Sequence, residues 1–402
     1  MLGHVLMASL KSCINVADFR AQCRRKMPGP IVDFFDGGAE DEQTVARNRA
    51  AYANWLLIPR QMRNVSSVDG ATTLMAQNVA WPFIVAPTGM AGLLHPDGEI
   101  GLATAAAAVG SLYTLSTVAS RSIEEVAGAI AGPKAFQLYP FRDRGITREL
   151  IQRARAASYV ALILTIDVQV PANRERDRRN GMVIPPKFNA RSIFNFAQHP
   201  IWCWNVLARR PVTLANFAGR RADPGVSLLS YINQQFDPAI TWRDLEWVAA
   251  EWGAPIAVKG VMAVEDAVLA VEHGASTVIV SNHGGRQLDG AAAPLDVLPR
   301  IADRLSGRAE LILDGGVRRG TDMLKAIALG ASGCMAGRVG LYGLGAGGTA
   351  GATAVLQALR SEFDRDLALL GAKTVRDIDR SKLIPLPPTH ENDSAHENFG
   401  PA

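Results

Sequence analysis

From Trp81 onward the chain alternates between short apolar runs and helical stretches, and this alternation limits the possible fold more than any other feature. The short runs are rich in β-branched residues and have the length of buried parallel strands. The longer stretches have the spacing of amphipathic helices. Eight such units close as a (β/α)8 TIM barrel, so we assign the chain to the α/β class. The expected strands are 82–86, 112–116, 135–139, 160–167, 255–259, 277–281, 310–313 and 333–337, and the helices that follow them are 100–109, 122–131, 146–157, 242–251, 264–273, 294–305, 321–329 and 341–370.

The chain has 402 residues, whereas a minimal barrel needs roughly 250. We expect an N-terminal extension at 1–13, a single barrel domain at 14–385 and a disordered, mostly polar tail at 386–402. Within the domain, 14–80 is expected to form an N-terminal helical cap. A long excursion, 170–240, separates the fourth strand from its helix.

Polar residues or glycines stand at the carboxyl end of all eight expected strands. Barrels of this kind keep their active sites at that end. One such residue alone is more often a satisfied core group, but eight that converge indicate a site. They are Pro87, Thr88 and Gly89; Ser116; Gln137 and Tyr139; Thr165, Asp167 and Arg174; Lys259; Ser281, His283 and Arg286; Asp314, Gly315 and Arg318; and Gly337 and Arg338.

The stretch 281–290, Ser-Asn-His-Gly-Gly-Arg-Gln-Leu-Asp-Gly, follows the sixth expected strand. Histidine is the side chain best suited to take a proton near neutral pH. Arginine holds a carboxylate through a planar fork of N–H donors. His283 and Arg286 therefore indicate a base and an anion clamp that act on one small acid. The alternative is an ordinary loop with a surface histidine and arginine.

The last two strand ends predict a phosphate site. Asp314-Gly315-Gly316 precedes Arg318, and Gly337-Arg338 follows the next strand. The loops after strands seven and eight commonly bind phosphate in such barrels, through backbone N–H groups and a helix start. Capping glycines and surface arginines are the alternative.

Residues 343–348 satisfy the pattern G-x-G-x-x-G, but we discount NAD. A dinucleotide fingerprint follows a strand within a βαβ unit, and no strand is expected after this point. We expect these glycines to form a flexible start to the last helix.

Charge and cysteine content exclude several classes of protein. A net charge of +4 is too small to argue for nucleic acid. Four cysteines, at 13, 23, 203 and 334, include no CxxC pair, so we expect free thiols, no metal site and a cytoplasmic location. No apolar run reaches the ~18 residues of a spanning helix.

Six motifs spread over about 14–385 resemble one family, the FMN-dependent oxidases and dehydrogenases of α-hydroxy acids. The appearance is nearest to the mandelate and respiratory L-lactate dehydrogenase branch. The resemblance implies FMN as the cofactor and a homotetramer. The motifs are Gly-Gly-Ala-Glu-Asp (37–41), Ala-Pro-Thr-Gly (86–89), Phe-Gln-Leu-Tyr (136–139), Val-Lys-Gly (258–260), the ten residues 281–290, and Asp-Gly-Gly-Val-Arg-Arg-Gly (314–320).

The resemblance also implies a role for each matching residue. His283 would be the base, Asp167 the carboxylate that pairs with its imidazolium, and Tyr139 the group near the substrate hydroxyl. Arg174 and Arg286 would hold the substrate carboxylate. The cofactor would be bound by Pro87, Thr88, Gly89, Ser116, Gln137, Thr165, Lys259 and Ser281 around its ring, and by Asp314, Gly315, Arg318, Gly337 and Arg338 at its ribityl phosphate end.

Two positions bear on the substrate. Phe34 stands where the family carries a tyrosine that contacts the substrate carboxylate, and phenylalanine cannot donate that hydrogen bond. Val118 stands where glycolate oxidase carries a larger tryptophan, which leaves room for a bulkier substrate. We predict oxidation of an (S)-2-hydroxy acid to the 2-oxo acid, with a mandelate-like or other larger acid as substrate. The alternatives are L-lactate as substrate, a flavin-binding barrel that has lost turnover, and a flavin-free barrel that acts on sugar phosphates.

The excursion combines ten Arg or Lys with three acidic residues between 174 and 223, and it carries several Trp and Phe. Such a composition suits a peripheral membrane contact through 180–220, at the inner face of the cytoplasmic membrane. A lid over the active site suits it equally well. Membrane contact would favour quinone over oxygen as the electron acceptor.

Overall fold

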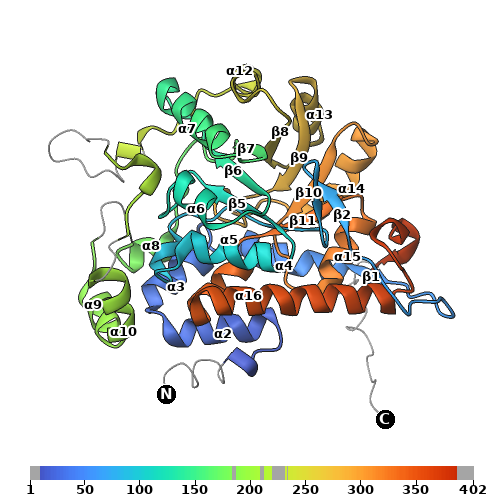
Figure 1. Ribbon diagram of the computed structural model, residues 1–402, viewed down its shortest axis with the longest axis horizontal. Coiled ribbons are helices and arrows are strands. Elements are labelled where there is room, and N and C mark those ends of the chain that lie inside the picture. Colours follow the sequence, from blue (N-terminus) through green and yellow to red (C-terminus); the bar gives the residue numbers. More distant parts are fainter. Residues whose placement is uncertain (1–9, 183–186, 209–211, 220–230, 233, 387–402) are drawn as a thin grey trace, which may run out of the picture.

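A closed barrel of eight parallel strands forms the body of the protein (Figure 1). The computed structural model describes residues 10–182, 187–208, 212–219, 231–232 and 234–386. The strands follow one another around the barrel in chain order, which confirms the predicted (β/α)8 fold. Most boundaries differ from the predicted ones by a few residues. The strands are β4 (Phe83–Val85), β5 (Leu112–Ser116), β6 (Lys134–Leu138), β7 (Ala161–Thr165), β8 (Ile256–Val261), β9 (Ala275–Ser281), β10 (Glu310–Asp314) and β11 (Gly333–Ala336).

Eight helices cover the outside of the barrel, one after each strand. Five of these helices follow their strand through a short loop, and α14 follows β9 after the longer loop 282–293. The helix after β4 is preceded by the 3-10 turn η2 (Ala91–Leu93), and the helix after β7 is delayed by the excursion, as predicted. The helices are α5 (Gly98–Ala108), α6 (Ile123–Ala129), α7 (Arg144–Ala156), α12 (Trp242–Trp252), α13 (Val264–Glu272), α14 (Pro294–Leu305), α15 (Gly320–Ala328) and α16 (Arg338–Leu369).

The inward face of the strands changes from apolar to polar along the barrel axis. A buried apolar layer contains Leu112, Ala135, Ile163, Ala257, Ile279 and Ile312. Side chains alternate along a strand, so the next inward position lies two residues further on. Those positions are Thr114, Gln137, Thr165, Lys259, Ser281 and Asp314, and all six are buried. The period of two thus places a ring of polar groups above an apolar floor.

The N-terminal cap is helical only in its first part. It contains α2 (Val16–Lys26), α3 (Gly29–Asp36), α4 (Gln43–Ala50) and the 3-10 helix η1 (Ala51–Asn54). Residues beyond these form three short strands, which corrects the prediction of a helical cap up to residue 80. They are β1 (Trp55–Leu57), β2 (Thr72–Leu74) and β3 (Gln77–Val79).

These extra strands have partners that a local pattern does not reveal. β1 pairs with β12 (Leu383–Pro385) near the opposite end of the sequence. β2 and β3 form a hairpin whose turn residues Met75 and Ala76 have φ of 49° and 59°. The hairpin packs Leu74, Met75 and Val79 against the apolar layer and so closes the amino end of the barrel.

The G-x-G-x-x-G glycines lie inside α16, which corrects the prediction of a flexible helix start near residue 341. The helix is interrupted at Gly347 and Gly348. A side chain at Gly345 would place its Cβ 2.4 Å from the Cys23 sulfur, so glycine lets α16 lie directly against α2 (Figure 1). Within the described residues, α16 alone is long and apolar enough to cross a membrane, but 72% of its most apolar window is buried inside the protein.

The excursion carries its own short helices at the edge of the molecule. They are α8 (Glu175–Arg179), α9 (Ala190–Ala197), α10 (Pro200–Trp202), the π-helical turn η3 (Cys203–Ala208) and the 3-10 turn η4 (Ala215–Phe217). α9 and α10 stand together at one side of the ribbon (Figure 1). α9 contacts the cap, where the Gly29 amide donates to the Asn195 side chain at 2.6 Å. The C-terminal 3-10 turns η5 (Val375–Asp377) and η6 (Arg380–Lys382) lead to β12. The predicted disordered tail lies outside the described residues, except for Leu386.

Candidate active site

A cavity of about 780 Å³ opens at the carboxyl end of the barrel and gathers nearly all of the predicted site residues. Two of them, Asp167 and Ser281, do not line the cavity but contact residues that do. The predicted residues that line it are Phe34, Pro87, Thr88, Gly89, Ser116, Val118, Gln137, Tyr139, Thr165, Arg174, Lys259, His283, Arg286, Asp314, Gly315, Arg318, Gly337 and Arg338.

His283 and Asp167 form a hydrogen-bonded pair at the mouth of the barrel. The imidazole Nδ1 lies 2.9 Å from Asp167 Oδ1. Burial by itself would raise the pKa of Asp167, but the charges of His283 and Lys259 outweigh it and hold the pKa below its usual range. The ionised carboxylate can only accept, so Nδ1 donates this hydrogen bond, and in a neutral imidazole Nε2 is then the nitrogen that carries the lone pair. The pair is therefore arranged as a base with an orienting acid.

The backbone around this pair is unusual. His283 has a φ of 58°, a left-handed conformation that is uncommon outside glycine. The Ser281 hydroxyl accepts a hydrogen bond from the His283 amide at 3.1 Å and thereby supports this turn. Gly260 has a φ of 105°, and a Cβ there would lie 2.7 Å from the Asp167 side chain. Glycine at 260 therefore leaves room for Asp167 beside β8.

A buried lysine lies below the cavity and is held by two partners. Lys259 Nζ lies 2.9 Å from the Ser281 hydroxyl and 2.8 Å from Asp314 Oδ2. Ser281 in turn donates to Asp314 at 2.8 Å. Burial lowers the pKa of Lys259, but Asp314 and Asp167 raise it more, so the pKa lies above its usual value and the ammonium stays charged. Ser281, predicted as a cofactor contact, also positions Lys259 and His283.

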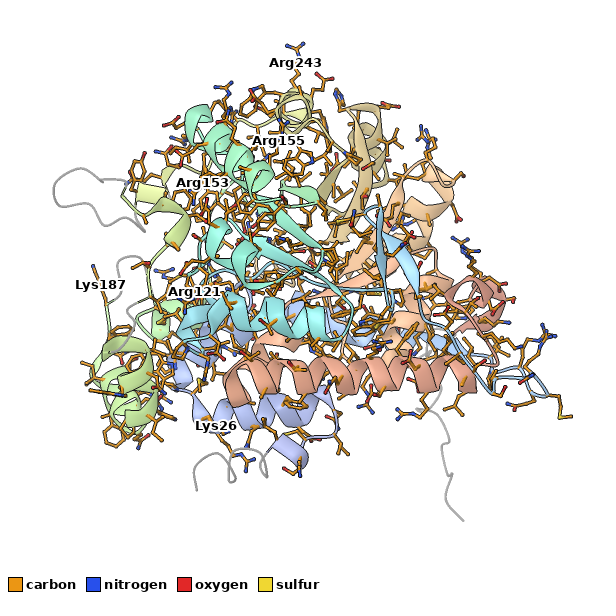
Figure 2. The ribbon with its side chains drawn as sticks, in the orientation of Figure 1. Lys26, Arg121, Arg153, Arg155, Lys187 and Arg243 are labelled. Carbon is orange, nitrogen blue, oxygen red and sulfur yellow. The ribbon has the colours of Figure 1, made fainter. Side chains whose placement is uncertain are left out.

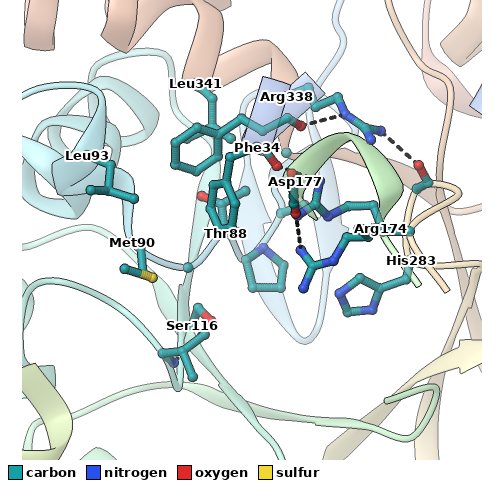
Figure 3. A pocket seen from close by; sticks show the side chains of 18 of the residues that line it. Phe34, Thr88, Met90, Leu93, Ser116, Arg174, Asp177, His283, Arg338 and Leu341 are labelled. Atoms are coloured by element: carbon teal, nitrogen blue, oxygen red, sulfur yellow. Dashed lines mark hydrogen bonds and ion pairs between the residues drawn. The ribbon is translucent and has the colours of Figure 1, made fainter. Parts of the chain in front are cut away.

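Two arginines, Arg174 and Arg286, and the aromatic ring of Phe34 form a further part of the cavity wall, of which Figure 3 labels Phe34 and Arg174. The Phe34 ring lies 5.8 Å from the Arg174 guanidinium and 5.6 Å from that of Arg286, so it stacks with both cations. Arg286 Nη1 donates to the backbone carbonyls of Phe34 and Gly37, which secures the end of α3. Burial, followed by the charges of Arg174 and Arg338, lowers the pKa of Arg286 to about 9. Clustered buried cations of this kind favour an anionic ligand.

Three buried polar atoms around the cavity have no partner among the described residues. They are Thr88 Oγ1, Gln137 Nε2 and Thr165 Oγ1. The side-chain carbonyl oxygen of Gln137 already accepts from the Ser116 hydroxyl at 3.1 Å and from the Thr117 amide, whereas the side-chain NH2 group has no partner among the described residues. Buried polar atoms normally have partners. A flat heterocycle with donors and acceptors on its edge, such as the flavin ring of FMN, matches these atoms.

The predicted phosphate end lies against the N-terminal cap. A Cβ at Gly316 would lie 1.9 Å from the Asn48 carbonyl oxygen, so the loop after β10 requires glycine against the cap. Arg338 uses three N–H groups for the backbone carbonyls of Phe35, Gly37 and Gly284. Arg318 makes one such bond, to its neighbour Val317. Arg318 is therefore the arginine with more donors left for a phosphate, and Arg338 chiefly joins α3 to the His283 loop.

Sequence reasoning missed most of the apolar wall. Met90 and Leu93 line the cavity from η2, and in Figure 3 they lie opposite His283. The aromatic content of the excursion was noticed, but its separate turns gave no periodic signal that would aim particular residues inward. Those residues are Phe196, Trp202, Val206, Val212, Ile232 and Phe236. Asp177 also lines the cavity and was not predicted as a site residue.

The comparisons with known proteins agree with this site. Residues 23–385 match the family model described as FMN-dependent dehydrogenase. The chain is 40% identical to an L-lactate oxidase of a Nostoc species over 94% of its length and 100% of the relative. It is 41% identical to an L-lactate dehydrogenase of Serratia proteamaculans, over 91% of this chain and 97% of the relative. A solved structure described as a monotopic membrane protein, (S)-mandelate dehydrogenase, has a TM-score of 0.89 and 34% identity over 93% of this chain and 100% of that chain.

Proposed function

The chain belongs to the FMN-dependent dehydrogenase family, and from that premise we propose that it oxidises a mandelate-like or other bulky (S)-2-hydroxy acid to the 2-oxo acid. One observation carries the proposal. The His283–Asp167 pair and the Arg174–Arg286 pair line one cavity, whose far side holds unpartnered polar atoms suited to a flavin.

Each residue has a task in this reaction. Arg174 and Arg286 hold the substrate carboxylate through charge-assisted hydrogen bonds. His283 Nε2 takes a proton from the substrate, and Asp167 stabilises the imidazolium that results. Tyr139 lies in the same cavity, where burial and the charge of Asp167 raise its pKa, so its neutral hydroxyl suits the substrate oxygen. When bound, FMN supplies a two-electron acceptor.

The cofactor contacts are proposed from the lining of the cavity. Thr88, Gln137 and Thr165 offer their unpartnered atoms to the ring edge, and Lys259 places a positive charge near it. Pro87, Gly89 and Ser116 complete this side of the cavity. Toward the phosphate end we propose Asp314, Gly315, Arg318, Gly337 and Arg338, with Arg318 as the main cationic contact.

The apolar wall supports a bulky side chain on the substrate. Val118 lines the cavity and packs on Gly89, where a Cβ would lie 2.6 Å from its Cγ2. Apolar and aromatic surface around a few fixed polar groups is typical of sites that bind bulky organic ligands. L-lactate is the second candidate, and it is supported by the names of the relatives at about 40% identity.

An anaerobic absorbance titration tests this proposal. The purified yellow protein should be bleached by (S)-mandelate and much less readily by (S)-lactate. Bleaching by lactate alone would move the assignment to lactate. A yellow protein that no 2-hydroxy acid bleaches would contradict the reaction. A colourless protein that cannot be reconstituted with FMN would contradict the cofactor.

We also propose that the excursion contacts the cytoplasmic membrane at its inner face and that a quinone accepts the electrons. Large apolar side chains of α9, α10 and η3 face outward, with Phe194 66%, Ile201 68% and Trp204 64% exposed. Lys187 projects from the same edge (Figure 2). This combination suits an interfacial segment.

Other excursion residues line the cavity, so the segment also acts as its cover. Oxygen is the alternative acceptor, because one close relative is named an oxidase.

Assembly as a homotetramer is proposed as well. The antiparallel pair β1–β12 leaves Leu56 and its cross-strand partner Ile384 about half exposed, at 47% and 49%. Apolar pairs in this position are candidates for burial between copies of the chain. Light scattering coupled to gel filtration measures the mass, and a monomer would contradict the proposal.

A further inference from the structure

The subsite formed by Arg174 and Arg286 contains one acidic side chain, Asp177, that the reaction does not require. Asp177 lines the cavity and has only 6% of its surface exposed. Its Oδ2 lies 3.6 Å from Arg174 Nη1, and Figure 3 shows Arg174 between Asp177 and His283. The only other carboxylate that lines the cavity in the described part of the chain, Asp314, is taken by Lys259.

Three other charged residues of α8 form ion pairs outside the cavity. Arg176 pairs with Asp33 and Glu42 of the cap, and Arg179 pairs with Glu175 along the helix. These pairs are partly or fully exposed. Among the carboxylates of this helix only Asp177 lines the cavity beside the half-buried arginines, and its distance to Arg174 is longer than a hydrogen bond. A buried carboxylate with so loose a partner contributes little to holding the helix in place.

We propose that Asp177 is the resident counter-ion of the substrate-carboxylate subsite and that it competes with the incoming carboxylate for Arg174 and Arg286. The inference rests on the proposed function. In the free protein Asp177 offsets the repulsion between the two guanidiniums, which keeps both in the cavity. When an anion binds, it faces Asp177 as a like charge. Asp177 is thus a positioning residue that weakens anion binding and eases release of the 2-oxo acid.

Protonation of Asp177 should therefore strengthen anion binding. Burial raises the pKa of Asp177 to about 6, and the charges of Arg174 and Arg286 offset part of that rise. The charged groups that face it are Arg174 and Arg176 from its own segment, Arg286 from the loop after β9 and Asp33 from α3. Above pH 6 Asp177 is ionised and opposes the anion, and below pH 6 it is neutral. Anion affinity should accordingly fall as pH rises through this range.

The test uses the FMN-loaded protein and oxalate, a carboxylate ligand without an α-hydrogen. Binding is followed by the change in flavin absorbance, which is independent of turnover. At pH 5 wild type and Asp177→Asn should have similar Kd values for oxalate. At pH 8 the variant should bind about tenfold more tightly, which corresponds to about one pKa unit of interaction. Because His283 is common to both proteins, the ratio of the Kd values isolates Asp177.

Controls separate this account from a structural role. Glu175→Gln removes a carboxylate of the same helix that does not line the cavity and does not shift the pKa of Asp177, and its Kd should match wild type at both pH values. Asp177→Glu keeps the charge and should restore weak binding at pH 8. Asp177→Ser provides a second neutral variant if the asparagine form does not fold. The proposal would be overturned if the ratio of the Kd values of wild type and Asp177→Asn were equal at both pH values, or if Asp177→Asn bound oxalate more weakly than wild type. If wild type keeps FMN but binds no oxalate at any pH, the proposed function itself loses its anion subsite.

Discussion

The two sides of the cavity are built by different forces. The strand ends hold His283, Asp167 and Lys259 in a network of short hydrogen bonds and ion pairs, with Ser281 joining the histidine turn to the lysine. The excursion contributes residues such as Phe196 and Trp202, which stack on each other at 5.4 Å, and the indole hydrogen bond from Trp202 to the Leu93 carbonyl does not reach the catalytic pair. The directional hydrogen bonds of the network hold the reacting groups in fixed positions. The apolar wall can change in shape and size without moving those groups. Substitutions on the two sides should accordingly separate rate from substrate preference.

The largest effect is expected for His283→Gln. The variant removes the proton acceptor while Arg286 and the FMN contacts remain, so flavin reduction should slow by about 10²–10⁴-fold for every 2-hydroxy acid. Stopped-flow absorbance under anaerobic conditions measures this rate. FMN content is the control. Equal rates in variant and wild type would remove His283 from the mechanism.

Val118→Trp should change preference more than rate. An added indole would occupy the space assigned to a bulky substrate side chain, at a cost of about 1–3 kcal/mol, or roughly tenfold to a hundredfold in kcat/KM for (S)-mandelate. (S)-lactate should be affected far less. Val118→Ala, which enlarges the same space, should keep mandelate activity. An equal loss for both acids from the tryptophan variant would show that Val118 does not border the substrate side chain.

Phe34→Tyr tests the position at which this chain departs from the family near the expected substrate carboxylate. The added hydroxyl can donate to the substrate carboxylate, and a hydrogen bond to a charged group contributes about 1.5 kcal/mol or more. KM should fall about tenfold, with a smaller change in kcat. Phe34→Leu, which removes the ring from Arg174 and Arg286, should raise KM. An unchanged KM in the tyrosine variant would mean that the substrate carboxylate lies away from residue 34.

The smallest effect on catalysis is expected for Phe194→Ser combined with Trp204→Ser. Both side chains are mostly exposed and neither lines the cavity, so activity with a soluble electron acceptor should stay near wild type. Binding to anionic liposomes at low salt should decrease, as measured by flotation. Wild-type protein that stays unbound under these conditions would contradict the membrane proposal.

The polar half of the site was predictable because strand period and barrel topology act locally. A residue at the end of a buried strand in a (β/α)8 barrel must lie near the mouth, which placed His283 and Gln137 correctly. The same rule does not reveal that Ser281, predicted as a cofactor contact, also joins Lys259 to the His283 turn. The bonds of Arg338 to the end of α3 were not predictable, because they depend on packing between segments about 300 residues apart.

Other features depended on long-range contacts in the same way. β1 exists because β12 lies beside it, and neither strand shows a strong pattern alone. Gly345 of α16 is explained by the close approach of α2, and Gly348 by its φ of 61° and the close approach of His95, and not by nucleotide binding. The apolar wall is assembled from turns of the excursion that have no common period. Sequence pattern thus predicted the elements and the chemistry, and tertiary contacts decided the shape of the cavity.

The most direct test of the account is the anaerobic rate of flavin reduction by (S)-mandelate and by (S)-lactate, measured side by side in wild type, His283→Gln and Val118→Trp. The account predicts that His283→Gln slows both acids by a similar factor, whereas Val118→Trp slows mandelate selectively. If His283→Gln changed the preference between the acids, or Val118→Trp slowed both alike, the division between a chemical side and a selective side of the cavity would be wrong.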